Sequence, residues 1–235
     1  RRHTRYISVT GVQTCALPIS MLFAIPPSRF NRKTAEAITG TIGKPSKMPG
    51  LAYGISAKLC NVGAKLAEIP GSVCNKCYAL KNNYTYPSVQ KAHQKRAEGL
   101  TNISWADSMI YLIGRTGETY FRWHDSGDLQ SFQHLLDIVK IAEALPAVSF
   151  WLPTKEKGLI YKYRAIFGDF PANLCVRLSA AMVDGKAPAY EGNTSTVHTG
   201  QPIGTECEAY KRGNKCGDCR ACWNRSVSNV SYRQH

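Results

Sequence analysis

The sequence predicts an α/β protein with a cysteine-rich, metal-binding C-terminal tail. Between residues 88 and 180 the hydrophobic periodicity alternates between that of helices and that of strands. Strands separated by single helices favour right-handed crossovers and a parallel sheet. We therefore expect either a partial, barrel-like parallel β/α fold or an open parallel sheet. The tail is indicated by four cysteines between Cys207 and Cys222.

The first twenty residues are expected to be an unstructured artefact. The run VTGVQTCALPI, residues 9–19, resembles a translated sequencing-library adapter. It has neither the apolar segment nor the cleavage site of a targeting peptide, and Met21 is the expected first biological residue. Without Arg1, Arg2 and Arg5 the formal net charge falls from +14 to +11, which favours an anionic partner such as a nucleic acid or nucleotide. Metal-bound thiolates would lower it further.

The elements follow from periodicity and turn signals. The pattern predicts helices over residues 88–100, 103–114, 132–145 and 155–167, and strands over residues 50–56, 119–124, 147–153 and 173–181. The helix over 132–145 carries apolar residues at helical spacing, from Phe132 to Leu145. After residue 183 the chain is expected to be a polar loop that leads into the cysteines. The predicted division is a core over residues 21–185, with the first cysteine set, and a tail over residues 186–235.

Polar loops after three predicted strands should meet, because working loops follow the carboxyl ends of parallel strands. They are HDSGD, PTKE and SAAMVDG. The candidate catalytic residues are His124, Asp125, Asp128 and Lys155, and the other polar candidates are Ser126, Thr154, Glu156, Arg177 and Ser179. Alternatives stay open at this point: Ser126 and Asp128 could cap a helix, and His124, Asp125 and Asp128 could bind a divalent ion for hydrolysis.

The C-terminal cysteines have the spacing of metal ligands. Cys207, Cys216, Cys219 and Cys222 form C-x8-C-x2-C-x2-C. Three cysteines at successive steps of three, Cys216, Cys219 and Cys222, resemble the chain that wraps a four-iron, four-sulfide cube. A structural zinc ion is the alternative.

A second set consists of three cysteines, Cys60, Cys74 and Cys77. A structural zinc site needs four ligands and would have to recruit His93, His124 or a tail cysteine. An iron-sulfur cluster held by three thiolates leaves one iron open. Cys74 and Cys77 could instead form a redox pair, but the βαβ context of such pairs is missing.

The motifs that surround these cysteines resemble a known family. MPGLAYGISAKLC, GSVCNKCYALK, FRWHDSGDLQS, FWLPTKE, NLCVRLSA and CGDCRACW are similar to the gene product eighty-eight domain of bacteriophage proteins. The similarity runs from about residue 40 to the end. It implies a phage protein, and no particular reaction.

The order of motifs also resembles the core of radical S-adenosylmethionine (SAM) enzymes. That resemblance implies a cluster on Cys60, Cys74 and Cys77, and a SAM site formed by Ser126, Gly127, Asp128, Thr154, Arg177 and Ser179. The tail would hold an auxiliary cluster. The chain departs from that pattern in having thirteen residues between its first two cysteines, where three are usual, and in its few visible strands.

The alternative function is a zinc-stabilised, nucleic-acid-binding phage protein. Cations and aromatic rings alternate at Lys81, Tyr84, Tyr86, Lys91, Lys95 and Arg96, where they could contact phosphates and bases. Such a run is also typical of the solvated face of a helix. No segment has the length of a membrane span, and without a secretion signal the expected location is the cytoplasm, of the host cell if the protein is phage-encoded.

Overall fold

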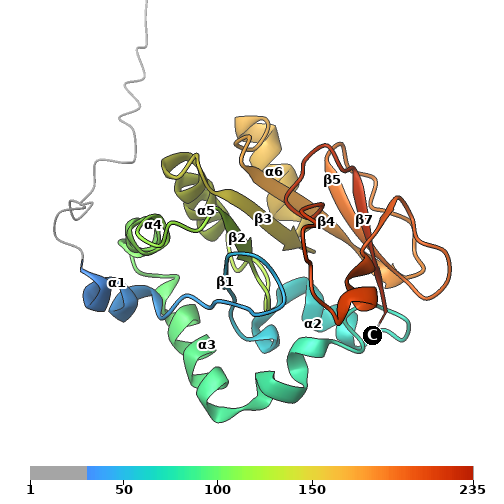
Figure 1. Cartoon of the computed structure of the whole chain (residues 1–235), viewed down its shortest axis with the longest axis horizontal. Helices are drawn as coiled ribbons and strands as arrows, with labels where there is room; N and C mark the ends of the chain where they lie inside the picture. Colours follow the sequence, from blue (N-terminus) through green and yellow to red (C-terminus); the bar gives the residue numbers. More distant parts are fainter. Residues whose placement is uncertain (1–30, 235) are drawn as a thin grey trace, which may run out of the picture.

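The computed structural model describes residues 31–234, so the expectation for residues 1–20 lies outside the described part. It contains an open, seven-stranded sheet in which every neighbouring pair of strands is parallel, in the order β1-β2-β3-β4-β5-β7-β6 (Figure 1). The strands are β1 (Leu51–Tyr53), β2 (Tyr120–Trp123), β3 (Ser149–Thr154), β4 (Leu174–Val183), β5 (Asn193–His198), β6 (Thr205–Glu206) and β7 (Asn229–Arg233). The expected parallel sheet is therefore confirmed, and it does not close into a full barrel, because β1 and β6 lie at opposite edges.

Helices connect the first four strands as the periodicity predicts. The α-helices are α1 (Arg32–Thr39), α2 (Asn61–Ala67), α3 (Pro87–Gly99), α4 (Trp105–Gly114), α5 (Phe132–Ala144) and α6 (Lys157–Phe167). Short 3-10 turns lie at η3 (Ala57–Leu59), η4 (Tyr78–Leu80), η5 (Asn82–Thr85) and η6 (Glu208–Arg212). Helix α5 begins where Ser131 accepts a hydrogen bond from His134 N at 3.1 Å, which is a typical N-cap.

The main core lies between the sheet and helices α4, α5 and α6 (Figure 1). Alternate strand residues point to this side, because successive side chains of a strand face opposite ways. Phe121, Phe150 and Leu174 are completely buried there. We call this side the helix face.

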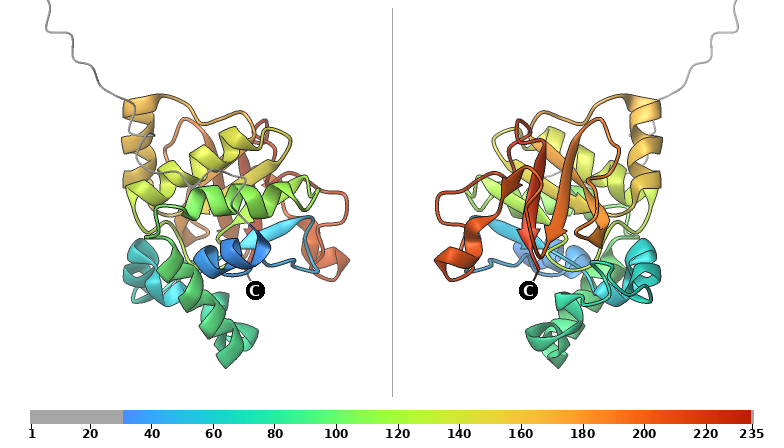
Figure 2. Two further views of the ribbon diagram at one scale, coloured as in Figure 1. Left: turned by 90° about the vertical axis from the view of Figure 1, so that its left-hand side faces the viewer. Right: turned by 90° about the vertical axis from the view of Figure 1, so that its right-hand side faces the viewer.

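The C-terminal segment covers the other face of the sheet. Trp151 packs against Cys222, Trp223 and Val230 in a separate buried cluster, and Trp223 Nε1 donates to Phe121 O at 2.9 Å. The two views of Figure 2 place α6 and the red C-terminal segment on opposite sides of the molecule. We call this second side the tail face.

Part of the segment predicted to be a polar loop is strand. Strand β5 reads NTSTVH and lies between β4 and β7 in the sheet. Its hydroxyls bond to neighbouring strands: Thr196 Oγ1 donates to Ser231 Oγ at 3.1 Å and Ser195 Oγ donates to Ser179 Oγ at 3.0 Å. The loop prediction was wrong because these polar side chains are buried as hydrogen-bonded pairs, and so carry no hydrophobic signal.

Residues 57–86 form a lobe beside the carboxyl ends of the strands (Figure 1). Val73 N donates to Ala181 O at 2.9 Å, and Val183 N donates to Gly71 O at 3.0 Å. The lobe therefore brings the first cysteine set to the edge where the polar loops end. Within residues 31–234, no helix has the length and apolar character to cross a membrane.

Candidate functional site

The loops after β2 and β3 meet at Asp128. Its carboxylate accepts hydrogen bonds from Thr154 Oγ1 at 2.6 Å, from Lys155 N at 2.8 Å and from Leu129 N at 2.8 Å. The Lys155 ammonium reaches β4, where it donates to Ala180 O at 2.6 Å. Three predicted site residues, Asp128, Thr154 and Lys155, are thus joined directly.

Two glycines allow this close packing of loops. A Cβ on Gly54 would lie 2.2 Å from Asp125 Oδ1 and 2.7 Å from Ser126 O. Gly127 has a φ of +79°, and a Cβ there would lie 2.5 Å from Ile55 Cγ1. A side chain at either position would push the loop away from the end of β1, so the predicted cofactor residue Gly127 is required by the backbone in any case.

The first cysteine set lies next to this loop junction. Cys60 precedes α2, and Cys77 N donates to Cys74 O in a tight turn at 3.1 Å. A methyl group on Gly63 would lie 3.5 Å from Cys60 Sγ and 3.6 Å from Cys74 Sγ. The distance between the two sulfur atoms is therefore no more than the sum of these two distances. A side chain at position 63 would contact both of them.

The charges of this site act on one another. Burial raises the pKa of the Cys60 thiol to about 12, and the charges of Asp128, Cys77, Cys74 and Glu156 add to the effect. Burial likewise raises the pKa of Cys74, which Lys155 opposes. For Lys155 itself burial lowers the pKa, against the neighbouring thiols and Asp128. Lys155 is thus the cation of a site otherwise made of thiols and carboxyls.

Asp128 has an unusual protonation equilibrium. Burial raises its pKa to about 6, although its three hydrogen bonds favour the charged form. Glu156, beside it, accepts from Val62 N at 2.9 Å and so ties the loop after β3 to helix α2. Asp128 can therefore exchange a proton near neutral pH.

The thiols of the first cysteine set lie near one another, but they are not arranged as the ligands of one metal ion. All eight cysteines of the described chain are free, and in residues 31–234 no three His, Cys, Asp or Glu side chains are arranged to hold a metal ion as they stand. One tetrahedral ion, bound by sulfur at about 2.3 Å, draws its thiolates close together. A four-iron cube holds its thiolates farther apart, around a larger group.

Two side chains of the loop after β2 have buried oxygens that make no hydrogen bond: Asp125 Oδ1 and Ser126 Oγ. Buried polar atoms are nearly always paired with protein groups or water, so these two oxygens have hydrogen-bonding capacity that the described residues do not use. The Asp125 backbone is held from the cysteine lobe, since Tyr78 Oη donates to Asp125 O at 2.7 Å. The sequence reading missed Tyr78, whose position directly after Cys77 was the available signal.

The predicted catalytic residue His124 lies in the core. It is 4% exposed, adopts a positive φ of 55°, and packs edge-on against His134 at 5.3 Å between ring centres. Burial lowers the pKa of His124 well below its usual range, with His134 and Arg122 adding to the effect. Both of its ring nitrogens lack a partner, so the ring is neutral and enclosed.

Arg177, predicted to contact a cofactor, holds the C-terminal segment to the sheet. Its guanidinium donates to five carbonyl oxygens at 2.7–3.1 Å, those of Thr194, Ala221, Cys222, Asn224 and Val227. Five donors are all that an arginine has. Ser179 accepts from Ser195 on the neighbouring strand. Both residues therefore have hydrogen-bond partners within the protein, Arg177 mainly in the C-terminal segment and Ser179 on the neighbouring strand.

The tail thiols gather on the tail face. Cys219 N donates to Cys216 O at 3.2 Å, and Cys222 Sγ lies 3.2 Å from Tyr232 Oη. Cys207 packs against the cluster that contains Cys222. Burial raises the pKa of Cys216, Cys207 and Cys219 raise it further, and Arg122 and Arg220 oppose this. The second predicted set is therefore also brought together.

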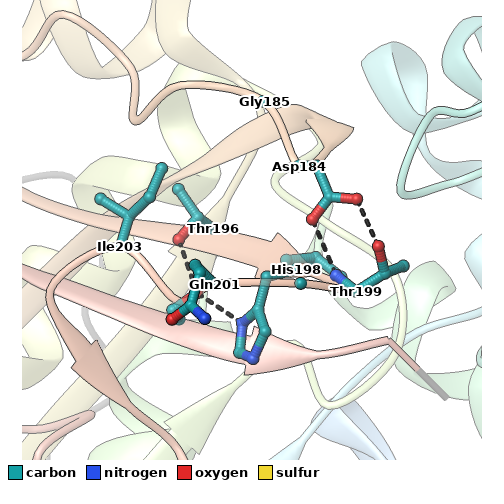
Figure 3. Close-up of a pocket in the computed structure, with 10 residues that line it drawn as sticks. Asp184, Gly185, Thr196, His198, Thr199, Gln201 and Ile203 are labelled. Carbon is teal, nitrogen blue, oxygen red and sulfur yellow. Dashed lines mark hydrogen bonds between the residues drawn. The ribbon is translucent and has the colours of Figure 1, made fainter.

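A separate hollow of about 310 Å³ lies between β5 and the C-terminal segment (Figure 3). His198 is 2.7 Å from Ser231 Oγ through Nδ1, and 3.4 Å from Glu206 Oε1 through Nε2. At its side Asp184 accepts from both the amide and the hydroxyl of Thr199. Because these polar groups already bond to one another, and Ser231 is fully buried, the hollow offers a ligand few free groups.

The basic stretch of residues 81–96 is partly engaged by the protein. Lys95 Nζ donates to Ala37 O at 2.7 Å, and Arg96 donates to Thr41 O and Gly54 O. Tyr84 Oη donates to Asp125 O at 3.4 Å. These three residues support the fold. Lys81, Tyr86 and Lys91, the other members of the predicted surface, are exposed.

The structure thus defines an open, parallel α/β protein with two groups of thiols, one at the carboxyl edge of the sheet and one on its tail face. The chain matches the model of the family Gene product 88 over residues 28–225 and belongs to that family. The phage-family resemblance is confirmed, and the comparisons do not support the radical SAM resemblance. Neither the curated proteins nor the solved structures contain a match to the chain.

Proposed function

We propose that the protein is an iron-sulfur protein whose first centre is held by Cys60, Cys74 and Cys77 and works as part of a radical-SAM-like enzyme. The observation that carries the proposal is the meeting of three thiols with Asp128 and Lys155 at the carboxyl edge of a parallel sheet. Ligand sites of open α/β sheets lie at that edge.

The residues of the site fit such a group. Gly63 leaves room beside two of the sulfur atoms, and Lys155 supplies a positive charge next to three thiolates. A cluster bound there supplies one-electron chemistry and an open iron that can take the amino and carboxylate groups of SAM.

The chain's own groups would position the second ligand. Asp125 Oδ1 and Ser126 Oγ are buried acceptors without partners in this loop, and the N–H groups of an iron-bound amine would be suitable donors to a carboxylate. Asp128 can hold or release a proton near neutral pH, since its pKa is raised to about 6. Tyr78 would help to hold this loop in place through its hydrogen bond to Asp125 O.

The test is anaerobic purification of the full chain, with iron, sulfide and zinc analysis and visible absorption. We expect a brown protein whose absorption changes when SAM is added. Cys74→Ala with Cys77→Ala should remove the iron of the first centre and the response to SAM. Cys175→Ala, a buried thiol of β4 outside both sets, is the matched control and should retain both.

A zinc-stabilised binding protein is the competing outcome. It is favoured by the tail, whose four thiols could close a structural zinc site. Colourless protein with zinc and no iron would overturn the proposal. If that protein also bound single-stranded DNA with a steep salt dependence, the exposed Lys81, Tyr86 and Lys91 would be the residues to replace next.

A further inference from the structure

Five exposed lysines of the lobe and of helix α3 have no partner in the described part of the protein. They are Lys58, Lys65, Lys76, Lys81 and Lys91. Within residues 31–234, none of these side chains donates a hydrogen bond or lies in an ion pair. From residue 57 to residue 91 the chain has a single acidic residue, Glu68. Carboxylates of the same segment therefore leave most of this positive charge unneutralised.

The elements that carry these lysines contact one another in turn. Helix α2 contacts η3, η3 contacts η4, η4 contacts η5, and η5 contacts α3. Lys65 lies on α2, Lys58 on η3 and Lys91 on α3. Lys76 and Lys81 lie on either side of η4. In both views of Figure 2, the teal lobe and the green α3 reach the lower end of the molecule. We call the surface formed by these five lysines the lysine surface.

Exposed aromatic rings lie among these lysines. The side chains of Tyr78 and Tyr86 are 49% and 56% exposed. The Tyr78 ring packs edge-on against Tyr84, with 5.8 Å between ring centres, and its hydroxyl donates to Asp125 O. A ring that the protein already holds in place loses little freedom when a base stacks on it. Cations that contact phosphates and rings that stack on bases are the two components of surfaces that bind single strands.

The lysine surface borders the first cysteine set. Lys58 is two residues before Cys60, and Lys76 lies between Cys74 and Cys77. Consecutive Cα atoms are 3.8 Å apart, so the Cα atoms of both lysines lie within about 8 Å of that of a cysteine. A polyanion bound to these lysines would therefore pass close to the thiols.

We infer that the lysine surface binds single-stranded nucleic acid, and that the strand runs across the first cysteine set. The binding itself depends only on the lysines and the tyrosines. It makes a nucleic acid the substrate class of the first centre, and this last step rests on the proposed function. A single strand uses both features of the surface, because its phosphates match the lysines and its unpaired bases can stack on the rings. An acidic protein would use the charge alone.

The first test measures the affinity of the full chain, purified without oxygen, for a fluorescein-labelled single-stranded DNA of mixed sequence. Fluorescence anisotropy is followed over a range of salt concentrations. Lys58→Gln, Lys76→Gln and Lys81→Gln together should lower the slope of log K against log salt by about 2, since each contact to a single strand contributes about 0.7. The affinity at about 0.1 M salt should fall by about tenfold or more.

The matched control removes the same charge elsewhere. It combines Lys33→Gln on α1, Lys162→Gln on α6 and Lys215→Gln in the tail, all of them exposed positions. The control should keep the salt slope of the unchanged chain. Equal slopes and equal affinities for the two triple variants would overturn the inference. All six side chains are exposed, so both variants should fold.

The second test addresses the rings. Tyr86→Leu should weaken binding by about fivefold or more, the effect of losing one stacked base. Tyr161→Leu, at a position of α6 that is 44% exposed, is the matched control and should bind as the unchanged chain does. If Tyr86→Leu had no effect and a polyphosphate chain of equal charge competed as well as the DNA, the surface would select charge alone and the assignment to nucleic acid would be wrong.

The third test places the strand on the thiols. In metal-free protein, bound DNA should slow the alkylation of Cys77 by iodoacetamide several-fold. Cys219, an exposed thiol of the tail, is the control and should react at an unchanged rate. Equal rates for Cys77 with and without DNA would overturn the placement of the strand.

Iron and sulfide analysis of the same samples separates this inference from the proposed function. Iron-containing protein that does not bind the DNA would overturn the inference and leave the first centre in place. Iron-free protein that binds the DNA through the lysines would keep the surface, and would overturn the assignment of the strand as a substrate.

Discussion

The two faces of the sheet are stabilised by different interactions. On the helix face, Phe121, Phe150 and Leu174 are buried against α4, α5 and α6, so stability there grows with apolar area. On the tail face, Arg177 gathers five carbonyls of the C-terminal half of the chain. A single substitution on the helix face removes only the apolar contacts of one side chain. A substitution of Arg177 removes five hydrogen bonds at once. The tail face should therefore depend on few residues.

The largest effect is expected for Arg177→Met, which removes all five hydrogen bonds while keeping much of the side-chain volume. Each buried carbonyl left without a donor costs about 1–3 kcal/mol. Because the five are coupled, we expect a total loss on the order of 5 kcal/mol in the free energy of unfolding. Urea denaturation gives the loss, and limited proteolysis should cut the segment between β5 and β7.

Arg164→Met is the control for this change. Arg164 donates to one carbonyl, that of Glu191 at 2.6 Å, near the surface. If the two variants were equally stable, the tail face would not depend on Arg177.

The next effect is expected on the helix face. Phe150→Ala should lower the free energy of unfolding by about 4 kcal/mol, the range for a large core ring, measured by urea denaturation. Phe167, which is 56% exposed at the end of α6, is the matched control, and its replacement by alanine should cost about 0.5 kcal/mol or less. If limited proteolysis of Phe150→Ala cut the C-terminal segment selectively, the two faces would not be stabilised independently.

A pH-dependent effect of intermediate size on the free energy of unfolding is expected from Asp128, at the carboxyl edge of the sheet. Burial raises the pKa of Asp128 to about 6 in the folded protein, against about 3.9 in the unfolded chain. Between these values the folded state binds more protons, so this carboxyl lowers stability as pH rises from about 4 to about 6 and the cost stays in full above that window. The total loss in the free energy of unfolding from this carboxyl is roughly 3 kcal/mol at most.

Metal-free protein tests this prediction. The difference in the free energy of unfolding between Asp128→Asn and the unchanged chain should vary across that pH window and be constant above about pH 7. A difference that is the same from pH 4 to pH 8 would show that Asp128 is not the group that titrates.

The smallest effect is expected for single hydroxyls of β5. Thr196→Val keeps the shape but removes the donor to Ser231 Oγ and the acceptor of Asn229 Nδ2. The expected loss is about 1–2 kcal/mol, measured by urea denaturation. Thr119→Val, at an exposed position just before β2, should leave stability unchanged. If Thr196→Val were as stable as the unchanged chain, apolar packing rather than hydrogen bonding would hold β5.

Prediction from the sequence succeeded on the helix face and failed on the tail face for the same reason. Helix α5 and strands β2, β3 and β4 can be predicted from the sequence, because their buried residues are mostly apolar and recur at helical or strand spacing. Strand β5 buries threonine and serine as pairs with partners on other strands, so no local pattern marks it as buried.

The site divides in the same way. Residue types and spacing alone indicate that the cysteines form two sets and that the loops with Asp128, Thr154 and Lys155 belong to one edge. The burial of Asp125 Oδ1 and Ser126 Oγ without hydrogen-bond partners depends on residues far apart in the chain and could not be predicted.

By itself the sequence determined the order of the first four strands and of helices α3 to α6 between them, and which thiols belong together locally. Only the tertiary structure decided that the sheet stays open, that Arg177 holds the C-terminal segment and that His124 turns into the core. The physical reason is that periodicity and short-range spacing act within one element, whereas burial of a polar or charged group is settled by partners that arrive from elsewhere in the chain.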